Sequence, residues 1–222
     1  MSMGRKMRWL LLTLIALMYR SAIADGPAVG IVDVMKRSQY SRLDTMVQAE
    51  TKSARALRVR NSFDALVGPL CIPASVTLRV VQGEVVAETI FGNVVVANEN
   101  LAALAEDERR FILAHELGHV MLGHWRQMEV LYEKWIPGEV TPERTDPIAA
   151  DLGREASALA YQQEFDADGY ALRALRLLGH APQAAIAASI ALGTHRDTST
   201  HPGTLKRVAA LNSIETAEGA EP

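Results

Sequence analysis

The stretch FILAHELGHVML, residues 111–122, decides the fold expected for this chain. Its apolar residues predict a buried helix, in which His115, Glu116 and His119 are the ionisable exceptions. On an α-helix, His115 and His119 lie on one face about one turn apart, so both imidazoles can bind the same metal ion. Two neutral imidazole nitrogens suit zinc, and the neighbouring Glu116 carboxylate can accept a proton from water. Gly118, a poor helix former, is expected to leave room beside the ligands.

The alternative explanation of this motif is a chance meeting of ionisable residues on a buried helix. Such groups need a partner in an apolar helix, which favours a metal site. A catalytic zinc usually has three protein ligands and an open position, so one ligand must come from elsewhere. The pattern with a third histidine six residues after the second fails, because that position holds Trp125. His124 lies about 180° around the helix from the first histidine, so we expect it at a helix end or a second site.

Two glutamates are candidates for the third ligand. Glu139 has the short spacing of thermolysin-like enzymes, but Pro137 and Pro142 bracket it. Glu164 stands in a predicted helix four residues before Asp168, so the two carboxylates share one face. One carboxylate can bind the metal while the other accepts a hydrogen bond from the far nitrogen of a ligand histidine. We favour Glu164, with an ordinary acidic helix face as the alternative interpretation.

Apolar periodicity predicts an α+β fold that is mostly helical, with one small antiparallel-type sheet. Between the second predicted helix and the third, three prolines indicate an irregular connection or a flap over the site. Helices are expected at 33–66 with a break near 38–41, from 107 to about 125, and at 148–178, 181–192 and 204–213. Strands are expected at 76–81 and 85–91, joined by a hairpin turn at 82–84, and at 94–97.

The N-terminal segment 1–24 has the pattern of a secretory signal peptide. Three basic residues precede the apolar run 9–19, and Ala22-Ile23-Ala24 provides small residues for cleavage. The run is short for a membrane span, although Arg20 just after it would suit an uncleaved anchor, which is the alternative. Residues 25–214 are expected to form one domain, and the polar residues 215–222 a disordered tail.

Charge and cysteine content exclude several classes of protein. Segment 1–24 carries four basic residues and no acidic ones, so its removal takes the formal net charge from −3 to −7. An acidic chain gives no reason to expect nucleic acid as a partner. Cys71 is the single cysteine, which rules out an internal disulfide; we expect it to be a small buried apolar residue.

Taken together, the motifs resemble the gluzincin metallopeptidase family of HtpX, BepA and the CAAX prenyl-protein endopeptidases. The resemblance covers about residues 94–211, through AEDE at 105–108, AHELGH at 114–119, EFDAD at 164–168 and STHP at 199–202 with Arg207. It implies a zincin-like domain over residues 25–214 with one zinc ion per chain. The roles it implies are zinc binding by His115, His119 and Glu164, general base catalysis by Glu116, orientation of a ligand histidine by Asp168, and a place near the active site for His201 and Arg207.

The resemblance further implies an endopeptidase that uses zinc-activated water to hydrolyse internal bonds of proteins or peptides. Strand 94–97 would dock the extended substrate by β-augmentation. The sequence shows neither the transmembrane helices after residue 24 nor the tetratricopeptide array of these relatives, which suits a minimal exported member acting on misfolded envelope proteins. We expect it in the periplasm or secreted, with peripheral membrane association or an inner-membrane anchor as alternatives.

Two rival functions stay open. The first is a latent, zinc-bound, chaperone-like binding domain that cleaves little, in which His124, His195 or His201 closes the zinc site. The second is a structural metalloprotein. Glu116 disfavours the structural role, because a structural zinc needs no adjacent base and usually has four protein ligands.

Overall fold

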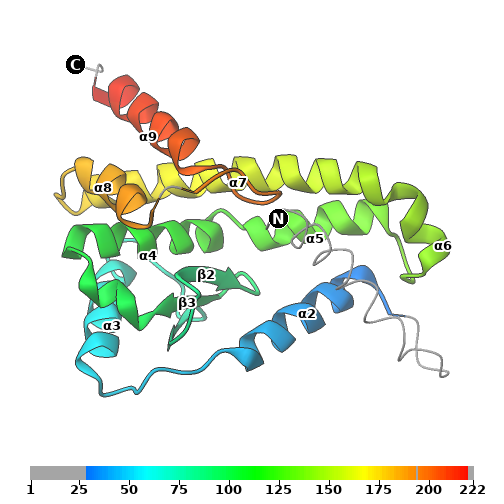
Figure 1. The fold of residues 1–222 in the computed structure, drawn as a ribbon, viewed down its shortest axis with the longest axis horizontal. Coiled ribbons are helices and arrows are strands. Elements are labelled where there is room, and N and C mark those ends of the chain that lie inside the picture. Colours follow the sequence, from blue (N-terminus) through cyan, green and yellow to red (C-terminus); the bar gives the residue numbers. More distant parts are fainter. Residues whose placement is uncertain (1–28, 194, 220–222) are drawn as a thin grey trace, which may run out of the picture.

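The computed structural model describes residues 29–193 and 195–219, so the predicted signal peptide lies outside the described residues. The described chain is mostly helical with one small sheet (Figure 1), which confirms the predicted fold class. The elements are α2 (Ile31–Thr45), α3 (Ala54–Val67), β1 (Thr77–Val81), β2 (Ala87–Ile90), β3 (Val94–Asn98), η2 (Glu99–Ala103), α4 (Glu106–Met121), α5 (His124–Trp135), α6 (Pro142–Thr145), η3 (Asp146–Ile148), α7 (Ala149–Leu177), α8 (Gln183–Ala191) and α9 (Thr204–Gly219).

The sheet is mixed, with strand order β1-β3-β2. β1 runs parallel to β3 and β2 antiparallel to it, so the predicted hairpin between β1 and β2 is wrong. The true hairpin joins β2 to β3 through Phe91 and Gly92, whose φ angles are 53° and 69°. The 82–86 connection is instead held by Asn98, whose Nδ2 donates to the carbonyl oxygens of Gly83 and Val85 at 2.8 Å each.

The two outer edges of the sheet differ. Segment 47–49 covers β1, with Ala49 N donating to Val80 O at 3.0 Å and Gln82 N donating to Val47 O at 2.8 Å. β2 has no strand partner on its outer side among the described residues. Within the described residues, the sheet therefore has one open edge, the outer side of β2.

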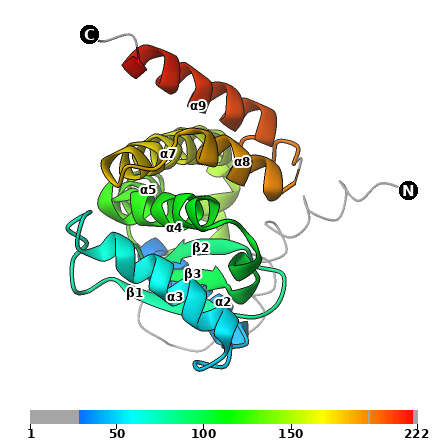
Figure 2. The same ribbon diagram turned by 90° about the vertical axis from the view of Figure 1, so that its left-hand side faces the viewer.

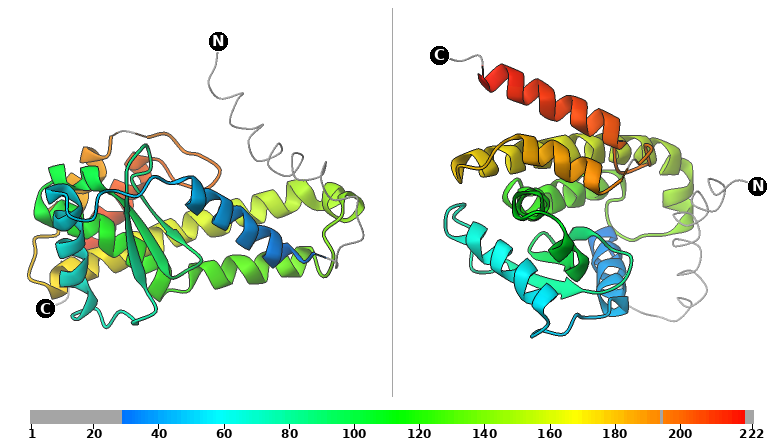
Figure 3. Two further views of the ribbon diagram at one scale, coloured as in Figure 1. Left: turned by 90° about the horizontal axis from the view of Figure 1, so that it is seen from below. Right: turned by 60° about the vertical axis from the view of Figure 1, so that its left-hand side comes forward.

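Stacked layers surround the helix that carries the HExxH motif. Figure 2 shows α4 between the sheet and the pair α7 and α8. Leu113 and Leu117 of α4 are fully buried, as the apolar stretch predicts. Further out, α9 lies against α7 and α8 (Figure 3), so the C-terminal helix can reach the same centre as α4.

Gly118 sets how closely α7 approaches α4. A Cβ atom at this position would lie 3.1 Å from Ala167 Cα and 3.2 Å from Ala167 O. The glycine therefore makes room for the backbone of α7, and not, as predicted, for the space beside the metal ligands. This close contact brings Glu164 of α7 to the histidines of α4.

Several predicted boundaries differ from the structure. α2 and α3 separate at residues 46–53 and not near 38–41. α4 ends at Met121, and α5 occupies residues for which an irregular flap was predicted, because Leu131 and Ile136 pack with Leu152 of α7 in a second apolar cluster. The long helix α7 is confirmed, with Gly179 at φ 76° behind its C-terminus.

The C-terminal helix and Cys71 also differ from expectation. α9 continues to Gly219, so the polar residues from Glu215 extend the helix where a disordered tail was predicted. Cys71 is exposed, with φ of 52°, because it lies in the turn after α3 and not in the core. Within residues 29–193 and 195–219, every helix is too short or too polar to cross a membrane.

Candidate metal centre

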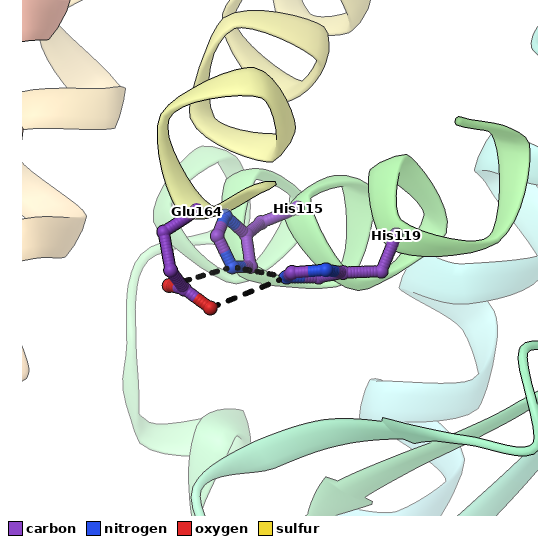
Figure 4. Close-up of side chains that lie close together, drawn as sticks. All are labelled: His115, His119 and Glu164. Atoms are coloured by element: carbon purple, nitrogen blue, oxygen red, sulfur yellow. Dashed lines mark hydrogen bonds and ion pairs between the residues drawn. The ribbon is translucent and has the colours of Figure 1, made fainter. Parts of the chain in front are cut away.

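The structure brings the three predicted metal ligands together. His115 and His119 project from α4 and Glu164 from α7, and their donor atoms all lie within 4.8 Å of one another (Figure 4). The two Nε2 atoms are 3.2 Å apart. Glu164 places Oε2 3.6 Å from His115 Nε2 and Oε1 3.5 Å from His119 Nε2. Both histidines thus turn the same ring nitrogen toward the carboxylate.

The environment of Glu164 fits a bound cation. Its side chain is 7% exposed, and Oε2 is buried without a hydrogen-bond partner in the described chain. Burial alone would raise the pKa of Glu164, but the hydrogen bond from His119 and the charges of His115 and His201 hold that pKa below its usual range. A buried carboxylate oxygen without a partner is uncommon. Two imidazole nitrogens and one carboxylate are a donor set typical of catalytic zinc, so these residues fit zinc.

Asp168 fixes the orientation of His115. Its Oδ1 accepts a hydrogen bond from His115 Nδ1 at 2.9 Å, which leaves His115 Nε2 free to act as a ligand. Arg207, from α9, donates from Nε to Oδ2 at 2.8 Å and from Nη2 to Oδ1 at 2.5 Å. Burial would raise the pKa of Asp168, but these hydrogen bonds outweigh burial and lower it. The Asp168 carboxylate is therefore an anion that accepts hydrogen bonds from His115 and Arg207.

Arg207 supports the ligands from a mostly buried position, with 21% of its side chain exposed. The fully buried Asp168 and, at 3.6 Å, Glu164 Oε2 surround its guanidinium. Burial works against its charge, but the two carboxylates raise the pKa of Arg207. The resemblance places Arg207 near the active site, and this geometry favours a role in which Arg207 steadies the metal ligands.

Glu116 lies beside the ligands and meets a residue that the sequence did not single out. Thr89 Oγ1, on β2, lies 2.9 Å from Glu116 Oε2 and 2.8 Å from Glu116 O. The hydroxyl has one proton, so it donates to one of these oxygens at a time. Threonine is common in strands, so no sequence signal distinguished Thr89.

His124 lies behind the second ligand histidine. Its Nδ1 is 2.8 Å from His119 Nδ1, on the side of that ring opposite the ligand cluster. Burial, and secondarily the neighbouring His119, lowers the pKa of His124 to about 4. The residue is the first of α5, so the predicted position at a helix end is correct for this residue.

The other candidate residues differ in whether they reach the ligand cluster. Glu139, the rejected ligand, forms an isolated β-bridge with Gly30 away from the cluster. His201 places Nε2 3.5 Å from Glu164 Oε1 while its side chain is 60% exposed. His195 turns its Nε2 to Leu192 O at 2.7 Å. Of the histidines considered for closing the site, His201 is therefore the one that approaches the carboxylate ligand, whereas His124 contacts His119 on the side opposite the ligand cluster.

A cavity of about 440 Å³ opens onto the cluster. Its walls come from β2, α4, α5, α7, α8, the start of α9 and the segment before α9. Val86 to Thr89 form one wall, so the open edge of β2 borders the cavity. The predicted docking strand 94–97 is wrong, because β3 pairs on both sides and has no free edge.

Comparison with known protein families gives a match to part of the chain. The sequence model of peptidase family M48 matches residues 85–134. That span contains β2, β3 and α4, and with them Thr89, Glu116 and the two ligand histidines, whereas Glu164 lies outside it. No curated protein matches the chain.

Proposed function

We propose that this chain, whose residues 85–134 match the sequence model of peptidase family M48, is a zinc-dependent endopeptidase acting on unfolded protein segments. One observation carries the proposal: two histidines and Glu164, which has a buried oxygen without a hydrogen-bond partner in the described chain, converge on the cavity beside Glu116. A histidine pair alone would suit several metalloproteins. The adjacent carboxylate and the open cavity favour hydrolysis over a structural role.

Each residue of the site has a separate role in the proposed hydrolysis of a peptide bond. A zinc ion held by His115, His119 and Glu164 would polarise the scissile carbonyl and lower the pKa of a water molecule. Glu116 takes up the proton of the attacking water and passes it to the leaving amine. The Thr89 hydroxyl holds the carboxylate of Glu116 in place from β2.

The open edge of β2 is the proposed substrate-binding element. Asn98 N donates to Val86 O at 2.8 Å, so Val86 and alternate residues after it face β3. The backbone groups of Ala87 and Thr89 therefore face the open edge, where an extended peptide can pair with them. Strand pairing reads the peptide backbone more than its side chains, which suits unfolded segments of many sequences.

We place the protein in the bacterial envelope, periplasmic or secreted, with misfolded envelope proteins as its substrates. The support is the sequence pattern of segment 1–24. An uncleaved segment would instead anchor the domain at the inner membrane, facing the periplasm. Sequencing the N-terminus of the protein purified from an envelope fraction distinguishes the two forms, since a cleaved chain begins at Asp25.

A second candidate function is a latent form that binds unfolded chains and cuts slowly. The position of His201, 3.5 Å from Glu164 Oε1, favours it, because an imidazole there can occupy the position that substrate needs. Substituting His201 by Ala separates the two. A latent enzyme gains activity on losing this ring, whereas an enzyme that uses His201 in catalysis loses it.

The experiment that tests the proposal is a cleavage time course on casein, an unfolded protein, with the zinc-loaded wild type and its Glu116→Gln variant. Zinc content is measured on both, and mass spectrometry locates the cuts. We expect only the wild type to cut, at internal bonds, with a chelator stopping it. Zinc bound in both proteins with no cutting by either contradicts the proposal and favours the binding function.

A further inference from the structure

We infer that His124 is a positioning residue of the metal centre, which fixes the tautomer and orientation of His119. The inference rests on the proposed zinc site and adds a residue to it. The Nδ1 atoms of the two rings are 2.8 Å apart, and their planes cross at 78° with centroids 4.8 Å apart. His119 points Nε2 at the other ligands and Nδ1 at His124.

The tautomers follow from these contacts. A ligating nitrogen carries no proton, so neutral His119 with Nε2 toward the metal carries its proton on Nδ1. Across residues 29–193 and 195–219, the hydrogen-bond partner found for this Nδ1 is the Nδ1 of His124. His124 must therefore accept there, with its own proton on Nε2. Each ring then has a single assignment.

The backbone holds the His124 ring in this position. α4 ends before Gly123, whose φ of 67° turns the chain so that α5 begins at once with His124. The residue is 3% exposed, and its carbonyl accepts a hydrogen bond from Gln163 Nε2 at 3.1 Å. Gln163 directly precedes the ligand Glu164 on α7. The support behind His119 is thus attached to the helix that supplies the third ligand.

The two ligand histidines have chemically different supports. His115 donates to the carboxylate of Asp168, whose charge Arg207 balances. His119 donates to the imidazole of His124 and not to a carboxylate. A neutral acceptor of the right reach should therefore replace His124, while an apolar side chain should not.

The test compares zinc affinity, by competition with a chelator, in the full chain and three variants. His124→Leu removes the acceptor, and His124→Asn keeps an oxygen close to the position of Nδ1. Trp135→Phe is the matched control, because it removes the hydrogen bond from Trp135 Nε1 to Glu155 at the far end of α5. The thermal midpoint of each metal-free protein reports on damage to the helix itself.

We expect the zinc dissociation constant to rise about 10- to 100-fold for His124→Leu and to return to within about fivefold of wild type for His124→Asn, as found for other residues that orient a metal ligand. Trp135→Phe should leave it unchanged. An affinity for His124→Leu within twofold of wild type, or equal losses in Leu and Asn variants, would overturn the inference.

A measurement on the wild type covers the case in which His124→Leu does not fold. Proton–nitrogen correlation spectra of the zinc-loaded protein should show a proton on Nδ1 of His119 and on Nε2 of His124. A protonated Nε2 on His119 would overturn the assignment. Failure of the wild type to bind zinc would overturn both this inference and the proposed function, whereas loss of the His124 effect alone leaves the proposed function standing.

Discussion

Replacing Asp168 by Asn tests the charge balance behind the metal ligands. The wild-type carboxylate is fully buried and accepts from His115 and from two nitrogens of Arg207. The amide keeps one acceptor oxygen but turns an NH₂ group toward a donor, and the substitution removes the charge of the closer of the two carboxylates around the guanidinium. Removing one partner of a buried ion pair costs about 3–5 kcal/mol.

The lower end of that range applies here, because the Arg207 side chain is 21% exposed and can partly hydrate. We therefore expect the free energy of unfolding of the metal-free protein to fall by about 3 kcal/mol, a drop in melting temperature of about 6–12 °C for a domain of this size. Urea denaturation followed by circular dichroism measures it. Asp166→Asn, on an exposed position of the same helix, is the control, with an expected change below about 0.5 kcal/mol.

Lowering the pH should reduce the difference in unfolding free energy between wild type and Asp168→Asn. The pKa of Asp168 is lowered in the folded state, so its contribution to stability is complete above the unfolded value of about 3.9 and is lost as pH falls toward the folded value. The gap between wild type and Asp168→Asn should shrink below about pH 4. A difference in unfolding free energy under about 1 kcal/mol at pH 7 would refute the reasoning, because removing a buried counter-charge is expected to cost more than that.

Three further changes test other contacts. Thr89→Val removes the hydrogen bond between the Thr89 hydroxyl and the general base Glu116, which is worth about 1.5–3 kcal/mol, but leaves the β2 backbone intact. It should therefore lower kcat about tenfold with little change in KM. Unchanged steady-state kinetics would reject this role for Thr89. Gly118→Ala should destabilise the protein by about 1–3 kcal/mol and weaken zinc binding, since its Cβ would press on α7, and equal stability in urea would contradict this packing. Gly153→Ala should instead stabilise the protein by about 0.5–1 kcal/mol, because an added Cβ at this position of α7 meets nothing within 4 Å. A lower melting temperature in calorimetry would contradict the open space described around Gly153.

Local sequence patterns were enough to predict the helices that carry the site. Residues four apart on a helix share a face whatever the rest of the fold does, so spacing alone places the His115–His119 pair and the Glu164–Asp168 pair. That the two helices meet was an inference from zinc chemistry, because three ligands were needed and α4 supplies two. The structure places all three ligands at one point.

The sequence could not predict features that depend on contacts between distant segments. β1 and β2 looked like a hairpin because they are adjacent in sequence, yet β3 lies between them. α5 looked irregular because its apolar residues match a face of α7 that the sequence does not reveal. The contacts of Thr89 with Glu116 and of His124 with His119 likewise exist only after these elements pack.

The most direct test of the central claim is the zinc dissociation constant of the wild type beside Glu164→Gln, Glu139→Gln and Glu116→Gln. We predict one zinc per chain in the wild type, an affinity at least tenfold weaker for Glu164→Gln, and wild-type affinity for the other two variants. Wild-type binding by Glu164→Gln, or a loss confined to Glu139→Gln, would contradict it and return the search for the third ligand to the loop after α5.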